Sequence, residues 1–140
     1  MFKIKPYFAS VLAFAGLLLV VMGIYFIFLR PALLPEDLRY MKTTLPVMHD
    51  SPPGLSAWLK KVFWVMGSYI FTTGLLTVFI SFTSFRKRLP GAFSVVVLAG
   101  IGSIGLMVVV NFMIGSDFKW VLLTFTLPWV FALILYRLHK

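Results

Sequence analysis

Four long stretches of the chain are apolar and carry no charged residue, and they are separated by shorter polar segments. The stretches are residues 7–29, 62–85, 92–114 and 120–136. Runs of this length and apolarity are typical of transmembrane helices, which need about 20 apolar residues to cross a bilayer. The pattern predicts an all-α membrane protein, a four-helix transmembrane bundle, with residues 1–140 as one transmembrane domain.

The only long polar segment, residues 30–61, lies between the first two apolar runs. Within it, residues 35–42 predict a short helix, since Pro35 suits a first turn and acidic residues at positions 36 and 37 suit the positive end of the helix dipole. Residues 45–54 contain three prolines and predict irregular structure. We expect the whole segment to form an outer loop that caps the bundle on its extracytoplasmic side.

Small residues recur at intervals of seven in the first two runs. Such rows allow two helix backbones to approach closely and favour left-handed packing of the two helices as neighbours. The alternative is that glycine is simply frequent in membrane helices. The helix-packing residues predicted in this way are Ala9, Gly16 and Gly23 in the first run and Gly67, Gly74 and Ser81 in the second.

Asn111 is the most polar residue inside the apolar runs and lies near the outer end of the third run. Its amide is predicted to bond across to another helix, a contact worth about 0.6–2 kcal/mol in membranes. A role in ligand binding is the alternative for this residue.

The composition agrees with a membrane location and excludes several classes of site. The chain is 61% hydrophobic and 12% charged, with a mean hydropathy of +1.00, against about 45–50% and about 25% in typical soluble domains. It has no cysteine, which excludes disulfides and thiolate metal sites. The formal charge of +9 comes mainly from residues at the ends of apolar runs, so we expect the lipid bilayer, and no nucleic acid, as its partner.

The distribution of basic residues predicts the orientation. Four spans put both termini and the turn at residues 86–88 on one side, where seven Lys and Arg residues occupy three short segments without an acid. The other side has six basic residues and all four acids. By the positive-inside rule we expect both termini in the cytoplasm.

The positions of the ionisable residues restrict the chemistry. The apolar runs contain no Asp, Glu, Lys, Arg or His, which argues against an ion-coupled transporter or pump. In the outer loop, Glu36, Asp37, His49 and Asp50 are metal-ligand or acid–base types, but two adjacent pairs match no HExxH or EF-hand pattern. We expect no metal, no cofactor and no catalytic residue.

The segment Leu29-Arg30-Pro31-Ala32-Leu33-Leu34-Pro35-Glu36-Asp37-Leu38-Arg39-Tyr40 resembles the segment after the first helix in small uncharacterised four-helix bacterial inner-membrane proteins. The resemblance covers this segment and the four-span layout. It implies a bacterial inner-membrane location and carries no activity with it.

The function expected from these features is docking: an integral membrane accessory or interaction protein that binds a membrane partner or a second copy of itself. Its contact residues are predicted in the outer loop, at Glu36, Asp37, Arg39 and Tyr40, because acids there adjoin an arginine and an aromatic residue. Two alternatives stay open. One is binding or carriage of a lipid or other apolar molecule in a cleft beneath the outer loop, and the other is a membrane enzyme that uses the loop acids.

Overall fold

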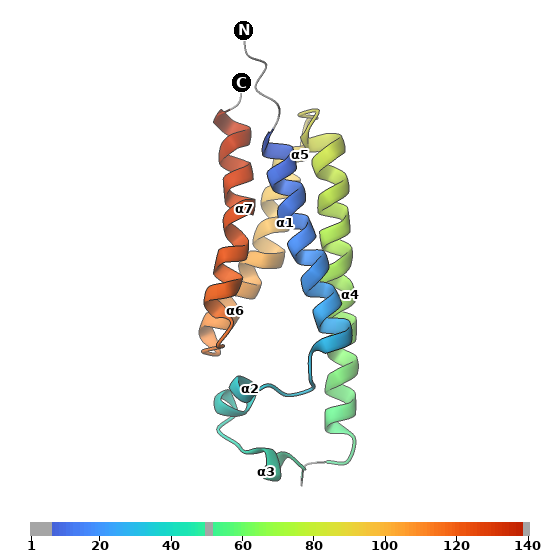
Figure 1. The fold of residues 1–140 in the computed structure, drawn as a ribbon, viewed down its shortest axis with the longest axis vertical. Coiled ribbons are helices and arrows are strands. Elements are labelled where there is room, and N and C mark those ends of the chain that lie inside the picture. Colours follow the sequence, from blue (N-terminus) through green and yellow to red (C-terminus); the bar gives the residue numbers. More distant parts are fainter. Residues whose placement is uncertain (1–6, 50–51, 139–140) are drawn as a thin grey trace.

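The structure is a computed structural model that describes residues 7–49 and 52–138 (Figure 1). All regular elements in these residues are helices. Four of them are long and apolar enough to cross a membrane, which confirms the predicted all-α class and the four apolar helices. The elements are α1 (Tyr7–Ile24) continued by the π-helix η1 (Tyr25–Leu29), α2 (Pro35–Tyr40), α3 (Leu45–His49), α4 (Leu55–Ile80) continued by η2 (Ser81–Phe85), α5 (Ala92–Gly100), η3 (Ile101–Gly105), α6 (Leu106–Met113) and α7 (Lys119–Leu138).

The helix bounds agree with the apolar runs at most ends and differ where charged residues are helical. The first span, Tyr7–Leu29, coincides with the predicted run, and the third, Ala92–Met113, ends one residue earlier. The second span begins at Leu55, seven residues before its apolar run, and the fourth extends to Lys119 and Leu138. Lysine and arginine end an apolar run but are good helix formers, so these helices continue through them.

The stretch predicted to be irregular, residues 45–54, contains the short helix α3. This prediction was wrong for the first half of the stretch. Proline at the second position of α3 does not interrupt it, because an N–H in the first turn has no partner within the helix.

Helix α1 has extensive contacts with both α4 and α7, and Figure 1 shows it between them with α5 behind. The start of α1, the turn between α4 and α5 and the end of α7 lie at one end of the molecule, whereas α2 and α3 lie at the other. An aromatic cluster joins the helices at the first end. There Phe8 lies edge-on to Phe85, with ring centroids 5.5 Å apart, and Phe85 stacks on Tyr136 at 4.5 Å.

The close contact of α1 with α4 is made by glycines. A Cβ atom at Gly74 would lie 2.6 Å from the backbone nitrogen of Val20, and one at Gly23 would lie 2.5 Å from that of Phe71. Real Cβ atoms do not come this close, so only glycine permits this separation of the two backbones. The structure brings four of the predicted packing residues, Gly16, Gly23, Gly67 and Gly74, into this contact, and it buries the other two of the rows, Ala9 and Ser81.

A second close contact joins α5 to α7. The indole of Trp129 lies against Gly100 and donates a hydrogen bond of 3.1 Å to the carbonyl of Val96. The widened π-helical turn of η3 begins directly after Gly100. A side chain inserted against a helix backbone is a common cause of such a local departure from α-geometry.

Candidate functional site

The candidate site is α2 together with the residues that hold it. Helix α2 begins with Pro35, and the carboxylate of Asp37 accepts a 2.8 Å hydrogen bond from the backbone N–H of Leu34. This bond satisfies one of the amides that a helix N-terminus leaves without a partner. Of the two acids predicted at the positive end of this helix, Asp37 is therefore the one that caps it.

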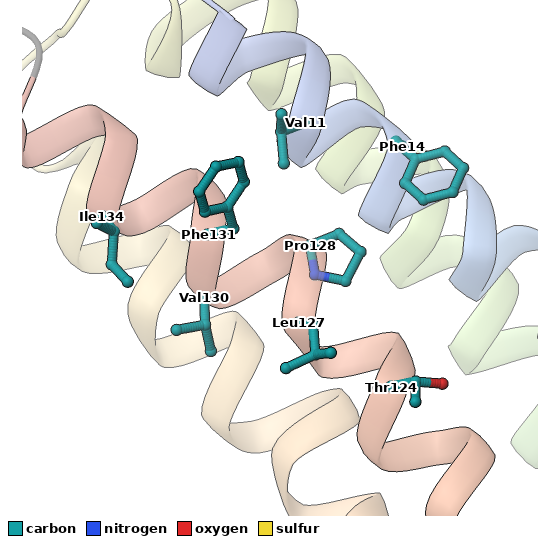
Figure 2. Close-up of a pocket in the computed structure, with 8 residues that line it drawn as sticks. All are labelled: Val11, Phe14, Thr124, Leu127, Pro128, Val130, Phe131 and Ile134. Atoms are coloured by element: carbon teal, nitrogen blue, oxygen red, sulfur yellow. The ribbon is translucent and has the colours of Figure 1, made fainter.

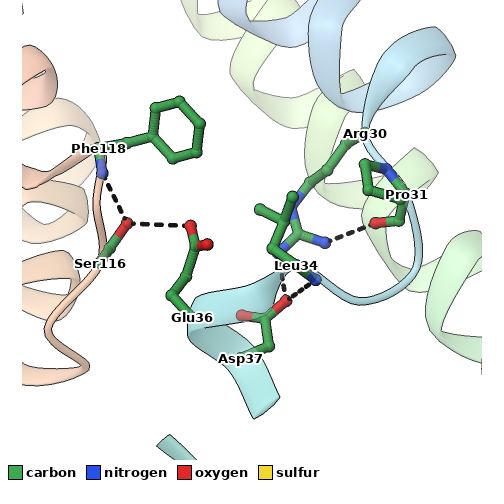
Figure 3. Close-up of polar contacts among 7 residues, drawn as sticks. All are labelled: Arg30, Pro31, Leu34, Glu36, Asp37, Ser116 and Phe118. Carbon is green, nitrogen blue, oxygen red and sulfur yellow. Dashed lines mark hydrogen bonds and ion pairs between the residues drawn. The ribbon is translucent and has the colours of Figure 1, made fainter. Parts of the chain in front are cut away.

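Asp37 also pairs with Arg30, whose side chain is 8% exposed (Figure 3). The guanidinium lies 3.4 Å from the ring centroid of Phe63 on α4 and donates to the carbonyl of Pro31 and, at 3.1 Å, to Asp37. A buried cation needs both a counter-charge and hydrogen-bond acceptors. Asp37 supplies the charge, so α2 is joined electrostatically to the end of the first span and to α4.

Glu36 faces the other way, toward the turn between α6 and α7. It is 3% exposed, and its carboxylate accepts a hydrogen bond of 3.3 Å from the hydroxyl of Ser116, which is also buried (Figure 3). The same hydroxyl oxygen accepts the backbone N–H of Phe118 at 3.1 Å. This contact joins residues 80 positions apart in the sequence and connects α2 to the turn between α6 and α7.

Arg39 forms an ion pair of 2.7 Å with Asp117, in the same turn as Ser116. Its hydrogen bond to the Asp117 carboxylate, together with the charge of that group, raises the pKa of Arg39 above its ordinary value. Both side chains are 60% exposed, and water screens such pairs strongly. The pair therefore helps to orient α2 relative to the turn but contributes little to the free energy of folding.

The four residues predicted to meet a partner thus divide into two groups. Glu36, Asp37 and Arg39 make contacts within the chain, whereas Tyr40 is 61% exposed. Glu36 and Arg39 connect α2 to the turn between α6 and α7, and Asp37 connects it to Arg30 at the end of the first span. Sequence reasoning missed the bracing partners Arg30, Ser116 and Asp117, of which only Asp117, as the one acid far from the loop, carried a signal.

Glu36 and Asp37, the two loop acids that the structure describes, point to different partners. In Figure 3 the carboxylate of Glu36 points toward Ser116, and that of Asp37 points toward Arg30. Asp50 and the side chain of His49 lie outside the part of the chain that is described. Among the described residues, no three His, Cys, Asp or Glu side chains are close enough to hold a metal ion.

A groove of about 620 Å³ runs between α1 and α7 (Figure 2). Its walls carry aliphatic and aromatic side chains, with Thr124 the one hydroxyl residue among them. The lining residues are Val11 and Phe14 of α1 and Thr124, Leu127, Pro128, Val130, Phe131 and Ile134 of α7. This groove lies along the spans, so it is not the cleft beneath the outer loop that the sequence suggested.

Asn111 makes a different contact from the predicted one. Its side-chain amide donates a 2.9 Å hydrogen bond to the carbonyl of Met107 in its own helix, and the predicted bond to another helix is not the one formed. A short side chain reaches the carbonyl one turn back without any help from a neighbouring helix, and this local bond satisfies the donor.

No family model, no curated protein and no solved structure matches this chain. The resemblance of residues 29–40 to small bacterial membrane proteins therefore stays a prediction. Any function has to be argued from the geometry.

Proposed function

We propose that this protein is a multi-pass docking protein of the bacterial inner membrane. In this proposal the four spans form a transmembrane bundle, residues 30–61 form a cap on its outer side, and the cap presents an apolar surface to a membrane protein partner. The observation that carries the proposal is a group of exposed apolar side chains within residues 30–61. It includes Tyr40, Met41, Leu45 and Trp58, which are 61%, 45%, 53% and 61% exposed.

The location of these side chains favours a protein partner over lipid. The second span has 31 residues, or about 46 Å at about 1.5 Å per residue, which exceeds a hydrocarbon core of about 30 Å. Its first turns carry Lys60 and Lys61, so these turns belong outside the core. Figure 1 shows α3, with Leu45 at its start, at the same end of the molecule as the start of this span.

The bracing of α2 supports the same proposal. A docking surface gains affinity when it is ordered before the partner arrives, because less side-chain and backbone entropy is then lost on binding. Glu36, Asp37 and Arg39 hold α2 at three points and leave Tyr40 outward. In this proposal the charged residues position the surface, and the apolar residues make the contact.

The experiment replaces two of the exposed residues together, Tyr40→Ala and Leu45→Ala, in the tagged full-length chain. Surface substitutions of this kind change stability by no more than about 0.5 kcal/mol, so the variant is expected to fold normally. The parent purified from native membranes in mild detergent is expected to retain a stoichiometric companion, either another protein or a second copy. The double variant is expected to lose it.

The matched control is Leu75→Ala with Leu76→Ala, two exposed residues of α4 within its apolar run. This variant is expected to keep the companion. If the Tyr40 and Leu45 variant retains every companion of the parent, or if the parent has none, the docking proposal fails.

We also infer that both termini face the cytoplasm. Support comes from the basic residues Arg86, Lys87, Arg88 and Arg137, which belong to the end of the molecule where α1 starts and α7 finishes. A reporter fused after Lys140 is expected to be active only if it is of a type that works in the cytoplasm, and a tag inserted near His49 is expected to be accessible from outside. A C-terminal fusion that is active in the periplasm would reverse the orientation.

A further inference from the structure

The groove between α1 and α7 has the length of one leaflet of a bilayer. Along α7 its lining extends from Thr124 to Ile134, or about 15 Å at about 1.5 Å per residue. The hydrocarbon core of a bilayer is about 30 Å thick, so the groove spans half of it. On α7 the lining is centred near the middle of the helix, because Thr124 lies five residues after its start and Ile134 four residues before its end. On α1 the lining residues Val11 and Phe14 lie in the half of the first span that is nearer the termini, so the groove extends from the middle of the spans toward that side.

The walls of the groove suit an acyl chain. Its volume of about 620 Å³ falls in the range of about 300–1,000 Å³ that is usual for ligand sites. Phe14, Leu127 and Phe131 are each more than half exposed, so the groove opens sideways, toward the acyl chains that surround a membrane-spanning helix. Figure 2 shows Phe131 and Pro128 on the α7 wall facing the helix that carries Val11 and Phe14.

The end of the groove carries positive charge. Arg137 follows Ile134 by three residues and Val130 by seven, so it lies one turn beyond the groove, on the Val130 edge of the α7 wall. On the α1 wall, Tyr7 precedes Val11 by four residues and Phe14 by seven, which places its phenol at the same end. Both side chains are exposed.

Arg137 has no carboxylate partner among the described residues. Its guanidinium lies 4.3 Å from the ring centroid of Phe93 on α5, so the side chain is held on the α5 side of the end of the groove, where its charge is not neutralised. The described acids, Glu36, Asp37 and Asp117, all belong to the opposite end of the molecule. Arg88, by contrast, is already engaged, because it donates to the carbonyl of Tyr136 and lies over that ring.

We propose that this groove and Arg137 bind one anionic phospholipid. One acyl chain lies between α1 and α7, and the negatively charged headgroup lies at Arg137 and Tyr7. The apolar groove supplies affinity for any phospholipid, and the uncompensated cation at its end supplies the preference for an anionic one. This site is separate from the docking surface on α2 and α3, at the other end of the molecule.

The test uses the full-length chain in mild detergent and two phospholipids with identical acyl chains, phosphatidylglycerol and phosphatidylcholine. Lipid retained per protein is counted by native mass spectrometry. The parent is expected to hold one phosphatidylglycerol about fivefold more tightly than phosphatidylcholine, the effect of about one basic residue near an anionic headgroup. Equal retention of the two lipids by the parent would overturn the proposal.

Two variants, each with a matched control, locate the site. Arg137→Gln is expected to abolish the preference, whereas Lys87→Gln, which removes one charge from the turn at the same end, is expected to keep it. Leu127→Trp fills the groove from an exposed position and is expected to release both lipids. Leu98→Trp, at an exposed position on α5 outside the groove, is expected to release neither. If Lys87→Gln lowers the preference as much as Arg137→Gln, or if Leu127→Trp retains both lipids, the site is not this groove.

Discussion

Replacing Gly74 with leucine is expected to force α1 away from α4 and to lower the free energy of unfolding in detergent. Even a Cβ atom at Gly74 would lie 2.6 Å from the backbone nitrogen of Val20 and 2.7 Å from the carbonyl oxygen of Gly16. Those neighbours are backbone atoms, which cannot rotate away as a side chain does, so the helices themselves have to move. The loss is expected at or above the upper end of the about 1–3 kcal/mol that overpacking usually costs.

The effect is large because membrane helices associate mainly through close packing and not through the hydrophobic effect. Separating α1 from α4 forfeits the dispersion contacts along the longest interface of the molecule, where Gly23 and Gly67 also lie. Unfolding in increasing denaturing detergent, followed by circular dichroism, measures the change.

Gly102→Leu provides the control for this prediction. Gly102 is also a glycine within a membrane span, but a Cβ atom there meets no atom within 4 Å. The added side chain extends into open space, and stability is expected to be unchanged or slightly higher, since leucine is the better helix former. Equal stability of the Gly74 and Gly102 variants would show that the contact of α1 with α4 is not the one described.

Replacing Asp37 with alanine is expected to destabilise the outer segment by about 2–3 kcal/mol. The change leaves the Arg30 guanidinium, only 8% exposed, without its counter-charge, and it also removes the acceptor of the Leu34 N–H. Breaking a fully buried pair costs about 3–5 kcal/mol, and the lower figure applies because the Asp37 side chain is 21% exposed. Hydrogen exchange of the α2 amides, which reports local opening, measures the effect.

Asp117→Ala is the matched control, because it removes the other ion pair of α2. Arg39 and Asp117 are both 60% exposed, and exposed pairs contribute about 0–1 kcal/mol. Protection of α2 is therefore expected to fall much less than in Asp37→Ala. A larger loss in Asp117→Ala than in Asp37→Ala would mean that α2 is held by the turn after α6 and not by the Arg30 site.

The two predictions concern features that differed in how far the sequence could reveal them. The seven-residue rows of small residues could be recognised in the sequence, because in a helix residues that recur at this interval lie along one face. The spacing alone therefore identified Gly16 and Gly74 as packing residues. Which helix each row met could only be argued from the similarity of the two rows.

The contacts of α2 with residues far along the chain were beyond sequence reasoning. Glu36 and Ser116 are 80 residues apart, and nothing in the neighbourhood of Ser116 marks it as the partner of an acid. The pairing follows from where the packed molecule places α2 relative to the turn between α6 and α7. For the same reason the sequence indicated a free charged surface at Glu36, Asp37 and Arg39. In the structure these residues bind other parts of the chain and hold α2 in place.

The class of protein was readable from the amino-acid sequence, because crossing a bilayer imposes a length and an apolarity that composition and order along the chain express directly. One helix end was poorly predicted, the start of the second span, which lies seven residues before its apolar run. Lysine marks the edge of the hydrocarbon core and not the end of hydrogen bonding along a helix. The hydrogen bond of Asn111 to Met107 is local, and the prediction missed it by giving the amide a partner in another helix. The location of the groove emerged only from the folded chain, because it depends on the distance between α1 and α7, which is set by the packing of the whole molecule.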